Sequence, residues 1–210
     1  MARVTVVNKS MKDQTCGRCG KELPKGSAYR WAKPGFRSRT RLIRCMDGAC
    51  SFRPSDLCTS NLKEAYAAQE LLEDAASDWG IGVELEDLDV SDLETAIEEA
   101  KGMAEGVREL YEEANSSWEE NSGSENYEFT EKVEALEAWE SELEDTDFDD
   151  KPEYEGPEDP GEQAEGQDDH EYEELVADYE RAQQEFETEL EEWADACRDA
   201  VVEAAGNLPV

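Results

Sequence analysis

Histidine is almost missing from this sequence, because His170 is the only one among its 210 residues. A Ser-His-Asp triad would have to use His170, which borders an acidic segment and is expected to be a solvated surface residue. The sequence also contains no HExxH zinc motif and no GxxxxGK[ST] phosphate-binding loop. Carboxylates are plentiful, but exposed helix faces do not separate their pKa values as acid-base catalysis requires. We therefore expect a protein that is not an enzyme.

Long apolar runs are missing as well. No stretch of eighteen apolar residues occurs, and the first residues, MARVTVVNKSMKDQTC, lack the apolar core of a secretory signal. Only 38% of the residues are hydrophobic and 36% are charged, which favours a small module joined to elongated helices over one large core. We expect a soluble, intracellular protein that is neither secreted nor bound to a membrane.

Basic residues are scarce beyond residue 63. Residues 1–63 contain fourteen Lys and Arg against four Asp and Glu, for a net charge of +10. The remaining residues contain six against fifty-two, for a net charge of −46, so that the whole chain carries −36. Salt-adapted proteins have an acidic balance of this kind, but such adaptation would be expected to acidify the first part too. Salt adaptation and selection for opposite charge in the two parts therefore both stay open.

A small β module is predicted for residues 1–60. Three short runs are rich in β-branched or aromatic residues and are flanked by Gly or Pro, as strands are: residues 3–7, 27–33 and 39–45. Pro34-Gly35 supplies a turn between the second run and the third.

An acidic helical region is predicted for residues 61–144, where apolar residues recur at helical spacing. A first helix follows a cap at Ser60, and a second begins at a capping box formed by Ser91 and Glu94. A third helix is expected over about residues 129–144.

The last part of the chain has two segments. Residues 145–169, rich in Pro, Gly and acid, are expected to form a disordered acidic linker, because they cannot bury enough apolar surface to become ordered. Residues 170–210 are predicted to contain a C-terminal amphipathic helix, over about residues 170–205.

Each long helix carries one apolar stripe, and these stripes include Trp118, Trp139 and Trp193. Because the other faces are strongly acidic, each stripe must be buried against another helix or against a partner chain. The sequence therefore predicts a mainly α second part, an antiparallel helical bundle or coiled coil formed within one chain or by self-association. The runs of Glu are expected to be solvated faces.

Five of the six cysteines lie in the first 58 residues. Cys16-x2-Cys19 and Cys45-x4-Cys50 are two short pairs, and a small β sheet that joins them supplies the four tetrahedral ligands that zinc prefers. Gly17 and Gly20 favour tight metal-binding turns. We predict one structural Zn²⁺ ion with no open coordination position, while free thiols and disulfides are the alternatives.

Cys58 competes with Cys50 for the fourth ligand position. The short spacing from Cys45 favours Cys50, because it mirrors the first pair. Cys58, at the start of a helix, is readily accommodated as a small packed residue.

Between the two cysteine pairs, basic residues alternate with the aromatic residues Tyr29, Trp31 and Phe36. Guanidinium groups bind phosphate and exposed aromatic rings stack on bases, so this combination is typical of a nucleic-acid-binding module. The predicted nucleic-acid-binding residues are Arg30, Trp31, Lys33, Arg37, Arg39, Arg41 and Arg44. In the alternative interpretation, the aromatic residues form the core of the module and the arginines pair with carboxylates of the same chain.

Four segments carry a resemblance to a known family: CGRCGKELPKG, RCMDGACSFRPSDLCTS, AYAAQE and EALEAWESELED. With them the chain resembles a family of proteins from tailed phages and archaeal tailed viruses, best over its first 70 residues. The resemblance implies a zinc-ribbon-like module followed by acidic helices, with zinc ligands at Cys16, Cys19, Cys45 and Cys50. Relatives tend to have a hydroxyl residue at the position of Cys58. A viral origin implies the host cytoplasm or the virion as the location, and the family carries no established reaction to transfer.

Three functions follow from these features. The first is a viral zinc-binding adaptor, in which residues 16–50 contact nucleic acid or a nucleic-acid machine and the acidic helices bind protein partners. The second is a virion structural or assembly protein, in which zinc only makes a small β element fold. The third is a mimic of nucleic acid, in which the acidic helices occupy the basic groove of a host protein.

Overall fold

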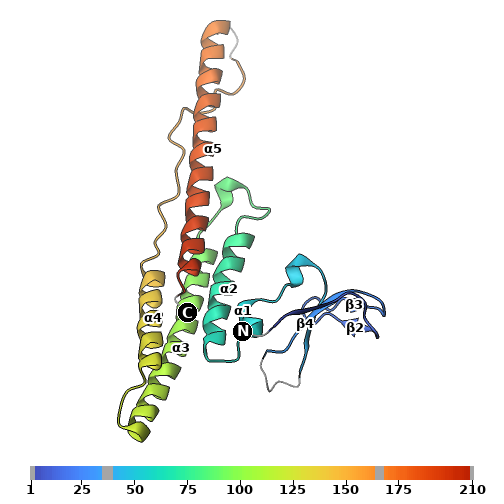
Figure 1. Ribbon diagram of the computed structural model, residues 1–210. Coiled ribbons are helices and arrows are strands. Elements are labelled where there is room, and N and C mark those ends of the chain that lie inside the picture. The colour runs from blue at the N-terminus through green and yellow to red at the C-terminus, as the bar shows by residue number, and fades with distance from the viewer. Residues whose placement is uncertain (1–2, 35–39, 164–167, 209–210) are drawn as a thin grey trace.

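The computed structural model describes residues 3–34, 40–163 and 168–208, and Figure 1 shows a small β module beside long helices. The strands of the module are β1 (Thr5–Val7), β2 (Gln14–Thr15), β3 (Glu22–Leu23), β4 (Tyr29–Ala32) and β5 (Leu42–Arg44). The α-helices are α1 (Pro54–Leu57), α2 (Leu62–Asp78), α3 (Ser91–Ser122), α4 (Tyr127–Glu144) and α5 (Asp169–Gly206). Two 3-10 helices, η1 (Gly48–Cys50) and η2 (Leu85–Asp87), lie in connections.

The β module contains two small antiparallel sheets. One has the strand order β1-β4-β5, and the other is the hairpin β2-β3. Trp31 in the central strand pairs with Thr5 on one side and with Ile43 on the other. The strands predicted for residues 3–7, 27–33 and 39–45 are confirmed as shorter strands. The hairpin β2-β3 was not predicted, because strands of two residues have no readable alternation.

Successive long helices run in opposite directions in Figure 1. Helix α3 packs against both α2 and α4, and α5 packs against α2. Their shared core contains the largest fully buried side chains, among them Trp139, Leu72, Leu93 and Leu136. The indole N–H of Trp139 donates a hydrogen bond to the carbonyl oxygen of Ala204 at 2.8 Å, which joins α4 to the end of α5. The apolar stripes are thus largely buried within one chain.

Trp118 does not follow the prediction that its stripe is buried. Its side chain is 49% exposed, near the end of α3 where only α4 accompanies that helix in Figure 1. The apolar stripe of α3 is buried only as far as Tyr111, because the core ends there. The helix then continues to Gly123, whose φ of 74° provides a left-handed end.

The predicted helix caps at Ser60 and Ser91 are wrong in their details. Helix α2 begins after Asn61, and Ser60 accepts a bond from the backbone N–H of Lys63 with its carbonyl, not with its hydroxyl group. Helix α3 is preceded by Val90, whose backbone is already helical, so Ser91 lies within the first turn and its side chain makes no cap. The carboxylate of Asp89 accepts from the backbone N–H of Ser91 instead, at 2.9 Å.

The acidic linker between α4 and α5 contains no helix or strand in its described residues, but it is not a free tether. Phe148 packs against the helical core, and the carbonyl oxygen of Asp149 accepts a bond from the indole of Trp193 at 2.8 Å. Lys151 donates to the carbonyl oxygens of Glu86 and Leu88. These contacts correct the expectation of a wholly disordered linker, because apolar side chains and a lysine anchor its first third.

Across the described part of the chain, we find no helix whose length and apolar character would suit a membrane span.

Candidate metal centre and the basic sheet

Four cysteines of the β module meet at one point. Cys16 follows β2, Cys19 lies in the turn before β3, Cys45 follows β5, and Cys50 ends η1. Their Sγ atoms all lie within 4.8 Å of one another, and those of Cys19 and Cys45 are 3.9 Å apart. The prediction that two local pairs converge on one site is confirmed.

The turn that carries the first pair is built by backbone hydrogen bonds. The N–H of Cys16 donates to the carbonyl of Lys21 at 2.9 Å, and the N–H of Gly20 donates to that of Cys16 at 2.9 Å. Gly20 has a φ of 71°, which a residue with a Cβ atom rarely adopts. Gly17 donates to the carbonyl of Ile43 at 2.8 Å, so the turn is fixed directly to β5.

The turn that carries the second pair is shaped by Asp47. Its carboxylate caps η1 by accepting from the N–H of Ala49 at 3.1 Å, and its carbonyl accepts from the N–H of Cys50 at 3.2 Å. The two turns are linked, because the N–H of Cys45 donates to Sγ of Cys16 at 3.3 Å. An N–H aimed at a sulfur stabilises the thiolate form that binds metal.

The four sulfurs differ in environment. Cys16, Cys45 and Cys50 are buried, and Cys19 is exposed. Burial alone would raise the pKa of Cys16, but the backbone N–H groups of Cys19, Arg18 and Cys45 outweigh it and lower the pKa to about 6. The hydrogen bond to Cys45, followed by burial, raises the pKa of Cys50 to about 12. Without a cation, then, the thiolate is favoured at Cys16 and disfavoured at Cys50, and a divalent ion would stabilise the thiolate form of Cys50.

The remaining two cysteines lie elsewhere. Cys58 packs against the helical core and its sulfur lies 3.1 Å from the hydroxyl oxygen of Ser60. Cys197 is buried in the same core. The preference for Cys50 over Cys58 as the fourth member of the cluster is therefore confirmed.

The predicted nucleic-acid residues fall on two faces of the sheet, because alternate residues of a strand point to opposite sides. Arg30 pairs with Arg44 across β4 and β5, and both face the connection that leads to the helices. Arg30 donates to the hydroxyl of Ser51 at 2.9 Å and to the carbonyl of Met46 at 3.1 Å. Both side chains thus bond within the chain, but only Arg44 pairs with a carboxylate, as the alternative interpretation predicted for the arginines.

Arg44 is the most enclosed of these residues, with its side chain only 9% exposed. Its Nη2 lies 2.8 Å from a carboxylate oxygen of Asp56, and its guanidinium lies 5.4 Å from the centroid of the Phe52 ring. A Cβ atom on Gly17 would lie 3.0 Å from Nη1 of Arg44, so a larger residue there would require the guanidinium to shift by a few tenths of an ångström. Arg44 therefore acts as a structural residue beside the cysteine cluster.

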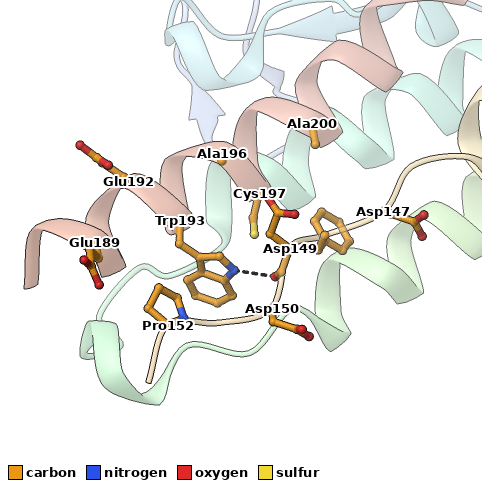
Figure 2. A pocket seen from close by; sticks show the side chains of 11 residues that line it. Asp147, Asp149, Asp150, Pro152, Glu189, Glu192, Trp193, Ala196, Cys197 and Ala200 are labelled. Atoms are coloured by element: carbon orange, nitrogen blue, oxygen red, sulfur yellow. Dashed lines mark hydrogen bonds between the residues drawn. The ribbon is translucent and has the colours of Figure 1, made fainter. Parts of the chain in front are cut away.

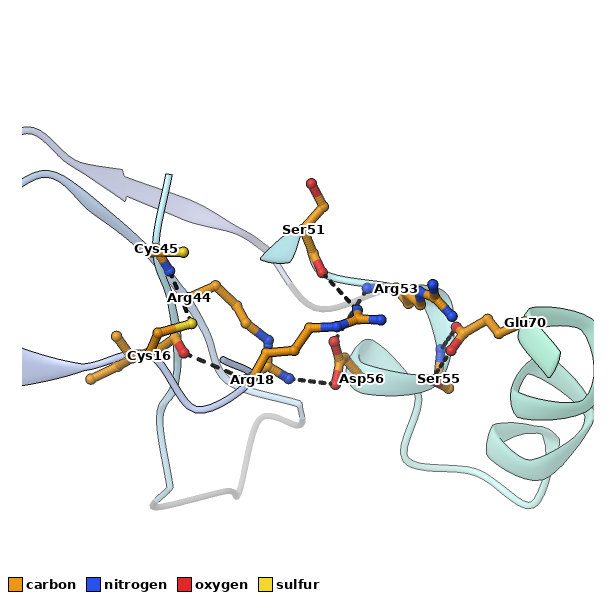
Figure 3. Close-up of polar contacts among 10 residues, drawn as sticks. Cys16, Arg18, Arg44, Cys45, Ser51, Arg53, Ser55, Asp56 and Glu70 are labelled. Atoms are coloured by element: carbon orange, nitrogen blue, oxygen red, sulfur yellow. Dashed lines mark hydrogen bonds and ion pairs between the residues drawn. The ribbon is translucent and has the colours of Figure 1, made fainter. Parts of the chain in front are cut away.

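Figure 3 shows how this connection continues to the helices. Ser55 donates two hydrogen bonds to the carboxylate of Glu70, from its N–H at 2.9 Å and from its hydroxyl at 2.6 Å. Arg53 forms a bidentate ion pair with Asp74, also on α2. The cysteine cluster is thus joined to α2 through Arg44, α1 and these paired side chains.

The opposite face of the sheet carries Trp31 and Arg41. Trp31 is half-buried, and the guanidinium of Arg41 lies over its ring at 4.5 Å from the centroid. Lys33 is exposed at the end of β4. Arg37 and Arg39 lie outside the described residues. Trp31 and Arg41 are therefore the described members that share the outer face of the sheet.

A pocket that the sequence did not indicate lies where the linker crosses α5 (Figure 2). Trp193 and Cys197 form its floor, and carboxylates of the linker and α5 surround it, among them Asp149 and Glu192. The hydrogen bond from Trp193 to Asp149 crosses this region. In the sequence, only Phe148, an apolar residue among the acidic residues of the linker, indicates that the linker packs against a helix here.

Comparison of the chain with protein-family models, with curated proteins and with solved structures found no match.

Proposed function

We propose that the chain is a non-enzymatic zinc-binding adaptor of a tailed phage or archaeal tailed virus. The observation that carries the proposal is the group of four cysteine Sγ atoms within 4.8 Å of one another. Around this group, a basic module meets nucleic acid or a nucleic-acid machine, while the acidic helices serve protein contacts. The resemblance of the cysteine-containing segments to the viral family supports the viral origin.

The donor set and its spacing support zinc. Four sulfurs at about 2.3 Å from a tetrahedral zinc ion lie about 3.8 Å from one another. The Sγ atoms of Cys19 and Cys45, 3.9 Å apart, are close to that edge length. Four thiolates fill the coordination sphere, so the ion would be structural and the module zinc-ribbon-like, with Cys16, Cys19, Cys45 and Cys50 as ligands.

The helices support a role in protein contacts. The first half of α5 extends beyond the other helices and is accompanied there only by the linker in Figure 1. Its apolar seam includes Leu175, which is 47% exposed, and Tyr179, which contacts Tyr154 of the linker. A seam of this kind suits a coiled-coil contact with a protein partner or with a second copy.

Metal analysis of the purified full-length chain tests the zinc site. We expect one zinc ion per chain, loss of the ion in Cys16→Ser, and retention in the matched control Cys58→Ser. If Cys58→Ser released the metal and Cys16→Ser kept it, the assigned ligands would be wrong. Binding of nucleic acid by the zinc-loaded chain, measured over a series of salt concentrations, tests the adaptor role.

A second candidate is the virion structural or assembly protein in which zinc is only a staple. The observation that favours it is that Arg30 and Arg44 are engaged within the chain and not displayed. This candidate predicts zinc binding without salt-sensitive binding to DNA or RNA, and loss of virion assembly when the zinc ligands are replaced.

A further inference from the structure

The outer face of the three-stranded sheet forms the floor of a groove. Tyr29 and Trp31 of β4 point to this face together with Ile43 of β5, because they are alternate residues of paired strands. Val7 of β1 and Arg41 complete the floor. The groove encloses about 430 Å³, within the size range of sites for small ligands.

The wall of the groove is basic. It is formed by the connection between β1 and β2, which contributes Lys9, Met11 and Lys12. Together with Arg41 of the floor, Lys9 and Lys12 give the groove three cationic side chains, and none of the lining residues is acidic. Among the described residues, none of these three cations forms an ion pair with a carboxylate.

The acidic residue next to this wall, Asp13, does not line the groove, and within the described part of the chain it forms no ion pair with the cations of the groove. The carboxylate of Asp13 accepts a hydrogen bond from the backbone N–H of Lys25 at 2.8 Å, in the connection between β3 and β4. A chain that carries a net charge of −36 thus keeps one concave surface with positive charge alone. Such a surface attracts a polyanion.

We propose that this groove binds single-stranded nucleic acid, with phosphates at Lys9, Lys12 and Arg41 and with a base stacked on the platform of Trp31 and Arg41. The inference rests on the proposed adaptor function and names its partner and its contact surface. The guanidinium carbon of Arg41 lies over the Trp31 ring, 4.5 Å from its centroid, and guanidinium planes, like aromatic rings, accept a stacked base.

The chemistry favours a single strand over other polyanions. Duplex DNA presents phosphates, but its bases are stacked on one another and cannot reach the aromatic floor. An acidic peptide can pair with the cations, but its carboxylate side chains carry no ring that could stack on the platform of Trp31 and Arg41. The groove therefore uses charge and ring surface together only with an unpaired strand.

The metal site supports the groove from below. Tyr29 and Ile43, which belong to the floor, also pack against the buried cluster of Cys16, Leu23, Cys45 and Cys50. Loss of the metal would therefore disturb the floor, and binding of the strand is expected to depend on zinc.

The test is fluorescence anisotropy with the full-length, zinc-loaded chain and three labelled probes: oligodeoxythymidylate, oligouridylate and a DNA duplex of equal length. Three phosphate contacts give a slope of about −2 for the logarithm of the binding constant against that of salt concentration. We expect tighter binding of single strands than of duplex. The double variant Lys9→Glu/Lys12→Glu should flatten the slope by about 1.4, and Trp31→Ala should weaken binding about 5- to 150-fold.

Lys63→Glu is the control for a reversal of charge away from the groove, because at an exposed position on α2 it makes the same change as each of the two lysine replacements. It should bind like the unaltered chain apart from a small general effect of charge. Zinc content is measured for each variant, and the lysine variants, which alter only exposed side chains, keep the test decisive if Trp31→Ala fails to fold.

The outcomes separate the two proposals. If the chain binds nucleic acid but the groove variants bind equally well, or duplex binds as tightly as single strands, the groove inference is overturned and the adaptor function stands. If the unaltered chain shows no salt-sensitive binding to any probe, the nucleic-acid part of the proposed function fails together with the inference.

Discussion

Arg44 and Asp56 form an enclosed ion pair, with Nη2 and Oδ1 2.8 Å apart, between the last strand of the β module and its first helix. The pair lies beside the cysteine cluster, because Cys45 follows Arg44 in the chain and Gly17 lies close to the Arg44 guanidinium. A residue that the sequence assigned to nucleic acid is thus part of the junction between the two parts of the molecule.

Replacement of Asp56 by Ala should destabilise the chain, because it leaves the guanidinium of Arg44 enclosed without its charged partner. We expect a loss of about 1.5–3 kcal/mol in the free energy of unfolding, measured by chemical denaturation of the zinc-loaded protein. Glu99→Ala, at an exposed position of α3, removes the same charge and should change stability by less than about 0.5 kcal/mol. Equal effects of the two substitutions would argue against a structural role for the pair.

The contribution of Asp74 to stability should depend on pH. Its hydrogen bond and ion pair with Arg53 lower the pKa of Asp74 below its ordinary value of 3.8. A lowered pKa in the folded state means that the contribution is fully present above about pH 5 and is lost as the pH falls through the folded-state pKa.

Asp74→Asn should therefore cost about 0.5 kcal/mol near neutral pH, because the Asp74 side chain is half exposed, and the cost should shrink toward pH 3. The pH dependence of the difference in unfolding free energy measures this effect, with Glu73→Gln on the neighbouring exposed position as the control. A difference that grows as the pH falls would contradict the assigned pair.

Truncation of Trp139 should cost far more stability than truncation of Trp118. Trp139 is fully buried and hydrogen-bonded to Ala204, so Trp139→Ala should cost about 3–5 kcal/mol of unfolding free energy. Trp118 is 49% exposed, and Trp118→Ala should cost less than about 1 kcal/mol. Thermal unfolding of both variants makes the comparison, and a large cost at Trp118 would mean that a partner chain covers it.

Release of the linker from α5 should be visible by proteolysis. Trp193→Phe keeps an aromatic ring but removes the N–H that donates to the carbonyl of Asp149. We expect faster cleavage of the linker at Glu153 and Glu155 by a glutamate-specific protease, read as the rate of fragment formation. The matched substitution Trp118→Phe should leave that rate unchanged. Equal rates in both variants would show that the linker is not held by this bond.

The cysteine cluster could be predicted from the sequence because its ligands come in local pairs. Cys16 and Cys19 share one tight turn, and Cys45 and Cys50 share another, so only one long-range contact is needed to complete the site. Cys58 lies outside the cluster because it follows α1 and packs against the helical core. Spacing therefore decided the cluster, and the identity of its ion stays a prediction.

The roles of the arginines could not be predicted in the same way. Arg30 and Arg41 are both arginines of the same basic segment, so the sequence alone does not distinguish them. The pleat of the sheet directs Arg30 toward Ser51 and Arg41 toward Trp31. The starting register of β4 and β5 decides which side chain faces which side, and no residue in the sequence signals it. The pairing of Arg44 with Asp56 likewise depends on how α1 folds back after η1.

The helical stripes predicted the existence of the helices but not the extent of their burial. Trp139 and Trp118 lie on comparable apolar stripes, and only Trp139 is covered by a second helix. Likewise, the acid-rich composition of the linker concealed Phe148 and Lys151, two side chains that find fixed positions on the helices. Burial depends on how far the neighbouring helices extend alongside each stripe, and the stripe itself does not indicate this.

Strand β4 is only four residues long, and its alternate members serve opposite purposes: Tyr29 and Trp31 line the groove, while Arg30 and Ala32 face the interior. Inserting or deleting one residue within this strand would exchange the two sets, driving the Trp31 ring toward Asp56 and turning Arg30 outward. Related chains should therefore tolerate changes of length in the connections on either side, but not within these four positions. The position of a residue along β4 therefore decides which face of the sheet it occupies, as much as the type of residue does.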